Sequence, residues 1–180
     1  MRKTIHKWFW AWEFDKEEKW LNEMAAKGLA LVAIGVCRYT FEESLPGEYN
    51  IRLELLDNVP AHPESERYIN FVEETGALYL GSIMRWVYFR KRTDSGEFNL
   101  FSDNNSRIRH INRVLLLLGV VGLLEISVGS SNVLLHVVNG SAVNLFASLV
   151  PLLFGLLIAY GFFRIHRIKA RLKKEQQLFE

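Results

Sequence analysis

Two long uncharged stretches near the C-terminus constrain this chain more than any other feature. The tract between Arg109 and Arg167 is almost wholly apolar, and residues 142–163 form a run of 22 without a charged side chain. An α-helix needs about 20 apolar residues, each rising about 1.5 Å, to cross a bilayer. After its flanking arginines, the first half of the tract is interrupted only by Glu125, near its far end. The sequence therefore predicts two spans, at about residues 110–130 and 142–163, joined as a helical hairpin.

Charge is distributed unevenly, and its distribution predicts how such a hairpin is oriented. Up to Arg107 there are 14 Lys and Arg against 17 Asp and Glu, whereas from Ile108 onward there are 8 against 3. The basic excess flanks the apolar tract, as is typical of cytoplasmic loops, so both termini are expected in the cytoplasm. A basic tail lying on anionic headgroups would also account for residues 164–180, but it would not explain the uncharged stretches.

The first 92 residues show alternating strand and helix patterns. Aromatic density and apolar alternation predict four strands, at residues 3–12, 29–43, 49–56 and 77–92. Two amphipathic helices are predicted between them. One begins with a capping box at Asp15 and ends at Gly28, and the other begins at Pro63 and ends at Gly76. The resulting order is β-α-β-β-α-β.

The two halves of this region echo each other at an offset of 48 residues. The positions that carry the echo are Trp20/Tyr68, Leu21/Ile69, Met24/Val72, Gly28/Gly76 and Phe41/Phe89. A split β-α-β with such an echo is typical of the ferredoxin-like sandwich, in which two helices cover one face of a four-stranded antiparallel sheet. We therefore predict an α+β, ferredoxin-like cytosolic domain with its first and last strands side by side. The predicted organisation is domain 1–92, linker 93–107, transmembrane hairpin 108–167 and basic cytosolic tail 168–180.

Sequence signatures of enzymes are lacking. The chain has no glycine-rich phosphate loop, no H-E-x-x-H and no Cys pair with metal-binding spacing. Its acidic pairs fit solvated surfaces better than paired catalytic carboxylates: Glu17/Glu18, Glu42/Glu43 and Glu73/Glu74. Cys37, the one cysteine, has no partner for an internal disulfide, which agrees with a reducing compartment. We therefore expect a protein that is not an enzyme and holds no cofactor or metal.

Aromatic residues on the first and last predicted strands form the main candidate interaction site. These residues are Trp8, Trp10, Trp12, Trp86 and Tyr88. The three N-terminal tryptophans share one strand face by period two. On an uncovered sheet face they would bind an apolar ligand or a second sheet. The alternative, that they face the helices as core residues, is favoured because Lys7 falls on the opposite face and Lys is rarely buried. Nucleic acid is not expected, because the domain is acidic and lacks the aromatic RNA-binding pattern.

Glu125 is the one acidic residue inside the predicted spans. Acids within a membrane mark functional positions by default. This leaves open a small transporter or a transporter accessory subunit that uses Glu125. The alternative is a packing or snorkelling role near the outer interface, since the second span offers no basic partner. Four glycines would allow close helix approach, within the hairpin or with another chain: Gly119, Gly122, Gly155 and Gly161.

Several segments resemble one known family. They are Lys7-Trp-Phe-Trp-Ala-Trp-Glu-Phe-Asp-Lys-Glu-Glu-Lys-Trp-Leu-Asn-Glu-Met-Ala-Ala-Lys-Gly28, Cys37-Arg-Tyr-Thr-Phe41, Pro46-Gly-Glu-Tyr49, Arg52-Leu-Glu-Leu55 and Met84-Arg-Trp-Val-Tyr-Phe-Arg-Lys91. Over roughly residues 3–110 the chain is similar to the bacterial group known as domain of unknown function 2812 (DUF2812). The resemblance implies an integral membrane protein of firmicute-type bacteria. Members often neighbour PadR-type transcriptional repressors, which implies a regulatory or envelope-stress role. The family supplies no established catalytic residues.

The main hypothesis is therefore a non-enzymatic, multi-pass protein of the bacterial inner membrane. Its cytosolic domain would sense a signal or bind a partner at the membrane. The expected partners are the lipid bilayer and either another protein or a second copy of the chain. Two alternatives remain open, the transporter that uses Glu125 and a module that binds a small ligand on its aromatic face.

Overall fold

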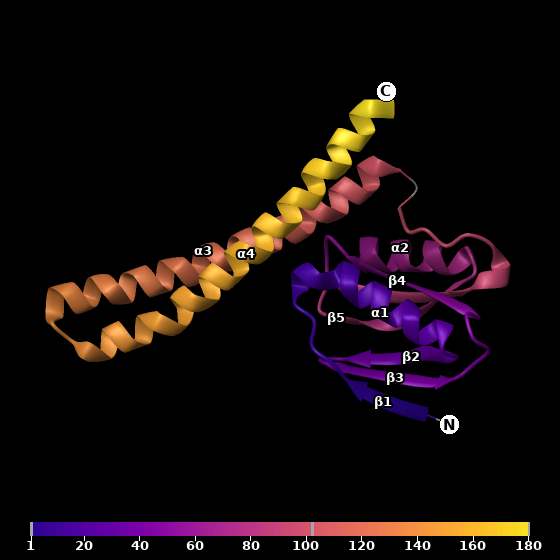
Figure 1. The fold of residues 1–180 in the computed structure, drawn as a ribbon, viewed down its shortest axis with the longest axis horizontal. Helices are drawn as coiled ribbons and strands as arrows, with labels where there is room; N and C mark the ends of the chain where they lie inside the picture. The colour runs from indigo at the N-terminus through magenta and orange to yellow at the C-terminus, as the bar shows by residue number, and fades with distance from the viewer. Residues whose placement is uncertain (1, 102, 180) are drawn as a thin grey trace. The chain divides into compact units, whose positions relative to one another are not determined.

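The computed structural model describes residues 2–101 and 103–179, which form two compact units. The first unit ends at His110 and the second begins at Ile111. Figure 1 shows the helices and strands along the chain. The strands are β1 (Arg2–His6), β2 (Leu29–Gly35), β3 (Arg38–Glu43), β4 (Tyr49–Leu55), β5 (Ala77–Ile83) and β6 (Trp86–Arg92). The helices are α1 (Phe14–Ala26), α2 (Pro63–Glu74), α3 (Asn104–Asn139) and α4 (Ala142–Phe179), with short 3-10 helices η1 (Ala11–Glu13) and η2 (Thr93–Ser95).

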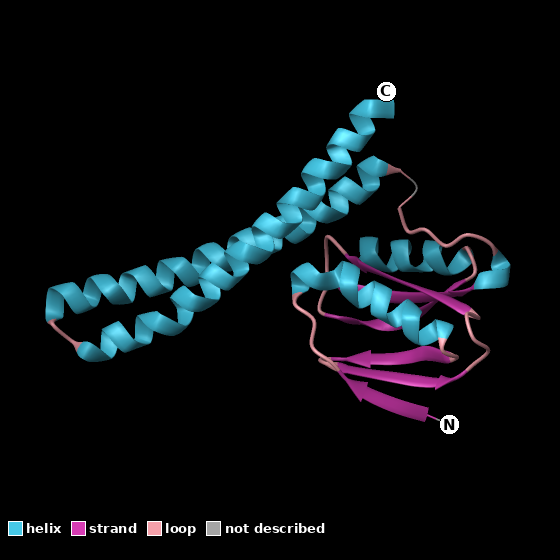
Figure 2. Cartoon of the chain, viewed as in Figure 1, coloured by secondary structure: helices cyan, strands magenta, loops and turns pink. Residues whose placement is uncertain are grey.

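The six strands form two antiparallel sheets, which we call sheet A (β1-β3-β2) and sheet B (β4-β6-β5) (Figure 2). The predicted α+β class is confirmed, but the single four-stranded sheet of the ferredoxin-like fold is wrong. β1 pairs with β3 and not with the last strand. Each of the two long predicted strands is a hairpin instead, turning at residues 36–37 and 84–85. Neither turn carries the Asn-Gly or Asp-Gly that marks a two-residue hairpin.

The echo at an offset of 48 residues corresponds to a structural repeat, β-α-β-β followed by β-α-β-β. β2 and β3 begin 48 residues before β5 and β6. Their pairing registers also match, since Leu29 pairs with Glu43 and Ala77 with Lys91. Both hairpins contain a register shift at the equivalent place. One structural unit is therefore built twice, and the two sheets have the same strand order.

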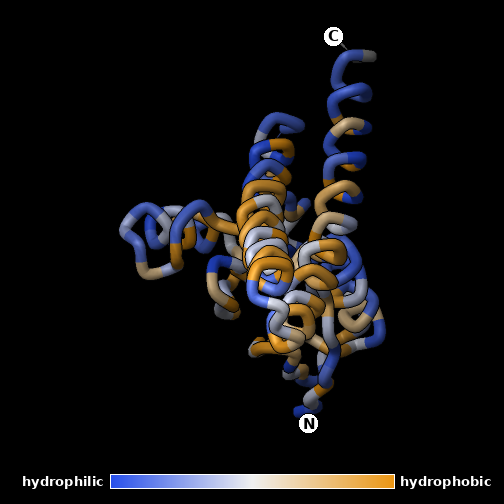
Figure 3. The backbone as a smooth tube through the Cα atoms, turned by 90° about the vertical axis from the view of Figure 1, so that its left-hand side faces the viewer, coloured by the Kyte–Doolittle hydropathy of each residue, from blue (hydrophilic) through white to orange (hydrophobic). Residues whose placement is uncertain are grey.

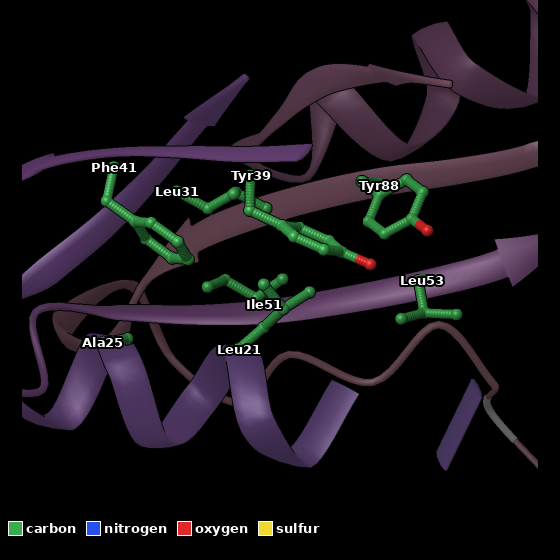
Figure 4. Packing of buried hydrophobic residues seen from close by; sticks show 8 residues of the cluster. All are labelled: Leu21, Ala25, Leu31, Tyr39, Phe41, Ile51, Leu53 and Tyr88. Atoms are coloured by element: carbon green, nitrogen blue, oxygen red, sulfur yellow. The ribbon is translucent and has the colours of Figure 1, made fainter. Parts of the chain in front are cut away.

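Helix α1 packs against both sheets and forms the centre of the first unit. Its Leu21 and Ala25 are buried with side chains from β2, β3, β4 and β6 (Figure 4). Helix α2 covers the other face of sheet B, where Ile69 packs in one cluster with Phe89. Full burial of each such side chain contributes about 1.5–3 kcal/mol. Sheet B thus has a helix on each face, whereas sheet A has α1 on one face.

The segment before α1 differs from the prediction. β1 ends at His6, so the predicted strand at residues 3–12 is about half as long. The carbonyl of Trp10 accepts the N–H of Glu13 at 2.7 Å, which closes the turn of η1. Helix α1 therefore begins directly after η1, with Glu13 as its N-cap residue. The capping box predicted at Asp15 is wrong, because that residue already lies in the first helical turn.

The second unit is a hairpin of two long apolar helices, and each is long and apolar enough to cross a membrane. Figure 3 shows hydrophobic residues along most of the hairpin and hydrophilic ones toward the C-terminus. The helices approach closely at glycines. A Cβ added at Gly129 would lie 2.5 Å from Leu152, and one at Gly155 would lie 2.7 Å from Ile126. Close approach at two predicted glycines, Gly122 and Gly155, is therefore confirmed, whereas a Cβ at Gly119 would make an ordinary contact of 3.6 Å with Phe162 and Gly161 is buried.

Candidate functional site

Trp8, Trp10 and Trp12 form an aromatic stack between β1 and α1. The first two rings meet nearly edge to face at 5.2 Å, and the rings of Trp10 and Trp12 are parallel at 5.0 Å. The stack runs from Trp8, whose residue surface is 57% exposed, to Trp12, which is buried. The predicted common strand face is therefore wrong, because the strand ends before these residues begin. One end of the stack belongs to the core and the other faces outward.

The other two predicted aromatics lie on β6, which pairs with β4 and β5 and not with β1. Trp86 packs 5.7 Å from the ring of Phe14 and 5.8 Å from that of His110. Tyr88 is buried beneath α1. The structure thus separates Trp86 and Tyr88 from the strand that was predicted to lie beside them.

A buried carboxylate links α1 to both sheets. Oε1 of Glu17 accepts hydrogen bonds from the hydroxyls of Tyr39 on β3 and Tyr88 on β6, each at 2.7 Å. Figure 4 shows the two hydroxyls pointing to the same side of the cluster. Burial raises the pKa of Glu17 above its ordinary value, and the bonds from Tyr88 and Tyr39 oppose that shift. Burial also raises the pKa of both phenols, which therefore stay protonated as donors. The predicted solvated position of Glu17 is wrong.

Three side chains close the outer edge of β4. The side-chain amide of Asn22 accepts the N–H of Ile51 and donates to its carbonyl, both at 2.9 Å. The carboxylate of Glu18 accepts the N–H of Leu53, two residues further along β4, at 3.2 Å. Nδ1 of His110 accepts the N–H of Leu55, two residues further still, at 3.4 Å. No feature of the sequence predicted these contacts, because the residues that make them lie 29 to 55 positions away from β4 along the chain.

Sheet A presents one exposed face, which we call the open face. Cross-strand pairing places side chains of β1 and β3 on it: Arg2 opposite Glu42, Thr4 opposite Thr40 and His6 opposite Arg38. All six are exposed or half-buried, and the hydroxyls of the threonines lie 3.5 Å apart. Glu42 lies 3.7 Å from the guanidinium of Arg90. The remaining charged groups on the face are all basic.

Glu125 lies where α3 and α4 approach each other. A Cβ added at Gly155 of α4 would be 3.6 Å from the Cβ of Glu125, which is half-buried. The residue therefore faces the second helix of the hairpin. Within residues 2–101 and 103–179, no group of three or more His, Cys, Asp or Glu could hold a metal ion.

Comparison with known proteins identifies one family. No curated protein and no solved structure matches the chain. The family described as "Protein of unknown function (DUF2812)" matches residues 13–123, which reach from η1 into α3 and cover more than half of the chain. The match includes the α1 face that closes β4 and the buried Glu17. The chain therefore belongs to the DUF2812 family.

Proposed function

We propose that this protein is a non-enzymatic protein of the bacterial inner membrane, in which the helical hairpin anchors a cytosolic domain that binds another protein. The observation that carries the binding role is the basic open face of sheet A. A regulatory or envelope-stress role agrees with the resemblance of the chain to proteins that neighbour transcriptional repressors. Both termini lie in the cytoplasm in this proposal.

The anchoring role is supported by the hairpin and by the charges beside it. The uncharged stretches of α3 and α4 are long enough to span the hydrocarbon core. Arg113 precedes the first stretch and Arg164 follows the second, at the same end of the antiparallel pair. Basic residues on one side of a membrane indicate the cytoplasmic side.

The binding role is supported by comparing the two repeats. On sheet B, the strand positions equivalent to the open face carry Ile51, Leu53 and Leu55, and α1 covers them. On sheet A the corresponding positions of β1 carry polar and basic side chains. In repeat architectures such polar outer faces keep a terminal unit soluble. The open face of sheet A therefore has the strand arrangement that accepts a helix on sheet B. Its basic side chains favour an acidic helix over an apolar one.

The partner we propose is a protein with an amphipathic helix that carries a row of acidic residues. Such a helix would lie across sheet A as α1 lies across sheet B. Arg2, His6 and Arg38 would face its carboxylates. Charge complementarity of this kind mainly raises the association rate and fixes specificity, so binding should weaken at high salt.

In-cell photo-crosslinking of the full-length protein tests this proposal. A photo-reactive residue at Thr4 should crosslink to a protein, and the crosslinked peptide should map to an acidic helix. The double variant Arg2→Glu/Arg38→Glu should abolish that crosslink. The matched control Lys19→Glu/Lys27→Glu makes the same charge change on exposed residues of the first unit outside the open face and should retain it.

Two results would contradict the binding role: a crosslink that survives charge reversal on the open face, or one that maps to peptides without an acidic helix. A crosslink that maps to α2 of a second copy would identify the partner as the chain itself. That helix carries Glu64, Glu66, Glu73 and Glu74. Retention in the membrane after deletion of residues 108–167 would contradict the anchoring role.

A second candidate is the small transporter or accessory subunit, favoured by the position of Glu125 between the two helices. An acid beside the contact between the two helices could line a path formed with further copies. Glu125→Gln keeps the size of the side chain and removes its charge. If transport or resistance phenotypes of the host are unchanged by this substitution, the transporter role fails.

A further inference from the structure

One end of the first unit carries exposed apolar side chains beside the point where the chain leaves that unit. We propose that this end inserts into the headgroup region of the bilayer. It consists of Trp8, Val36 and Met84, which we call the docking tip. The inference rests on the proposed membrane anchoring and adds a second, peripheral contact with lipid.

The two β-hairpins place their turns at the same end. Arg90, which pairs with Leu78 of β5, donates to the carbonyl of Leu31 on β2 at 2.9 Å. Three residues further along both strands, a Cβ added at Gly81 would lie 3.7 Å from Ile34. β2 and β5 therefore run side by side in the same direction. The turns that follow these two strands, at residues 36–37 and 84–85, therefore lie at the same end of the first unit.

The side chains of the docking tip are among the most exposed apolar ones in the first unit. Val36 is 75% exposed and Met84 is 83% exposed. Trp8 joins them because the preceding N–H, that of Lys7, donates to the carbonyl of Cys37 at 3.1 Å. Apolar groups gathered on a surface mark contacts with protein, membrane or ligand.

Both turns also hold a residue in a strained conformation. Cys37 and Met84 have φ of 55°, in the left-handed region that favours Gly or Asn. A residue with a side chain there costs about 1–2 kcal/mol relative to ordinary backbone. The exposed thioether of Met84 makes up little of that cost by packing within the unit. Strain of this kind is typical of sites whose side chain has a function.

The chain leaves the first unit at this same end. The ring of His110 lies 5.8 Å from Trp86, the first residue after the second turn. The N–H of Leu56, one residue beyond β4, donates to the carbonyl of Arg85 within that turn at 2.9 Å. Arg113, the last charged residue before the uncharged stretch, follows His110 by about 4.5 Å of helix. The docking tip therefore lies at the end of the first unit where the chain continues toward the uncharged stretch.

The chemistry of the tip fits a lipid surface better than a protein one. Tryptophan is enriched at membrane interfaces, where its ring and N–H meet apolar and polar groups. The turn residues 35–38 and 83–86 include two arginines and no acidic residue. Exposed Lys7 adds another positive charge. Basic groups beside apolar ones favour anionic headgroups.

Fluorescent labelling of the full-length protein in liposomes tests the inference. In a Cys37→Ser background, single cysteines are introduced by Val36→Cys and Met84→Cys. The matched control is Leu45→Cys, because Leu45 is 70% exposed and follows β3 at the opposite end of sheet A. Each variant is labelled with an environment-sensitive nitrobenzoxadiazole probe. The liposomes contain phosphatidylcholine and phosphatidylglycerol.

The probes at positions 36 and 84 should emit at shorter wavelength than the probe at position 45. They should be quenched by lipids that carry a spin label near the headgroup and be less accessible to aqueous iodide. Flotation of the same liposomes separates the two proposals. If the protein floats with the lipid but all three probes are equally accessible to iodide, the docking tip is refuted and the anchor stands. If the protein does not float with the lipid, both proposals fail.

Discussion

The side-chain amide of Asn22 bonds both backbone groups of Ile51, so a residue of the first repeat occupies the strand edge of the second. An unpaired edge is a template for aggregation, and proteins cover or charge such edges. Here α1 provides the cover while its apolar side forms the core. The same helix thus fixes how the two repeats are joined.

Asn22→Ala should lower the free energy of unfolding by about 1–3 kcal/mol, since two hydrogen bonds of about 0.5–1.5 kcal/mol each are lost. Urea titration of the full-length protein in detergent, followed by tryptophan fluorescence, measures this change. All five tryptophans lie in the first unit, so the signal reports on that unit alone.

Asn70→Ala is the matched control for Asn22→Ala. Asn70 occupies the equivalent position of α2, 48 residues later, but it is exposed. Exposed substitutions of this kind change stability by about 0.5 kcal/mol or less. Equal losses of unfolding free energy in the two variants would show that the two hydrogen bonds from Asn22 to Ile51 contribute nothing beyond helix propensity.

The buried Glu17 should make stability depend on pH. Its pKa is raised in the folded state, so the folded protein binds the proton more tightly than the unfolded chain. The contribution of this group to the free energy of unfolding is therefore full below its ordinary pKa of 4.5. That contribution is lost as the pH rises through the raised pKa of the folded state. Glu17→Gln should gain stability relative to the unmodified protein over the same rise in pH.

Urea titrations at several pH values above 4.5 compare the two proteins. Glu18 is half-buried and desolvation raises its pKa too, but it is present in both proteins and cancels in the difference. Glu23→Gln, an exposed position on the same helix, changes the net charge by the same amount and serves as the control. A stability difference that stays constant with pH would contradict a raised pKa at Glu17.

The sequence predicted the features that repeat or that depend on one segment at a time. The 48-residue echo, the apolar helices and the helix ends at Gly28 and Gly76 all come from local patterns. Both glycines have positive φ, and a Cβ at Gly28 would lie 2.9 Å from the carbonyl oxygen of Ser44. Only glycine fits such a position without strain.

The hairpin turns were missed for the opposite reason. Cys37 and Met84 give no turn signal, so each pair of strands looked like one long strand. The contacts of Glu17 were also hidden, because its partners lie 22 and 71 residues away on different sheets. A surface helix and a helix between two sheets have similar periodicity. Whether an acidic residue such as Glu17 is buried therefore depends on how the strands are arranged around the helix, which the periodicity of the helix does not indicate.

The strained turn at Met84 predicts a trade between stability and membrane contact. Met84→Asn relieves the left-handed strain, because Asn tolerates that region, and should stabilise the first unit by up to about 1 kcal/mol. The same variant removes an apolar group from the docking tip and should reduce lipid quenching of the tryptophans in liposomes. Leu45→Asn, which makes the same exchange at an exposed site where no positive φ occurs, should change neither quantity.

The helical hairpin depends on Gly129, where the two helices approach most closely. A Cβ there would lie 2.5 Å from Cγ of Leu152 and 3.2 Å from its backbone nitrogen, so the backbone of α4 must shift. Gly129→Ala should destabilise the hairpin by about 1–3 kcal/mol through overpacking. In Gly119→Ala the added Cβ would meet Phe162 at 3.6 Å, an ordinary contact, and the hairpin should be unchanged. Thermal melting of both variants is measured in detergent. The melting is monitored by disulfide formation between cysteines placed on α3 and α4. Equal melting of the two variants would mean that the close approach at Gly129 does not hold the helices together.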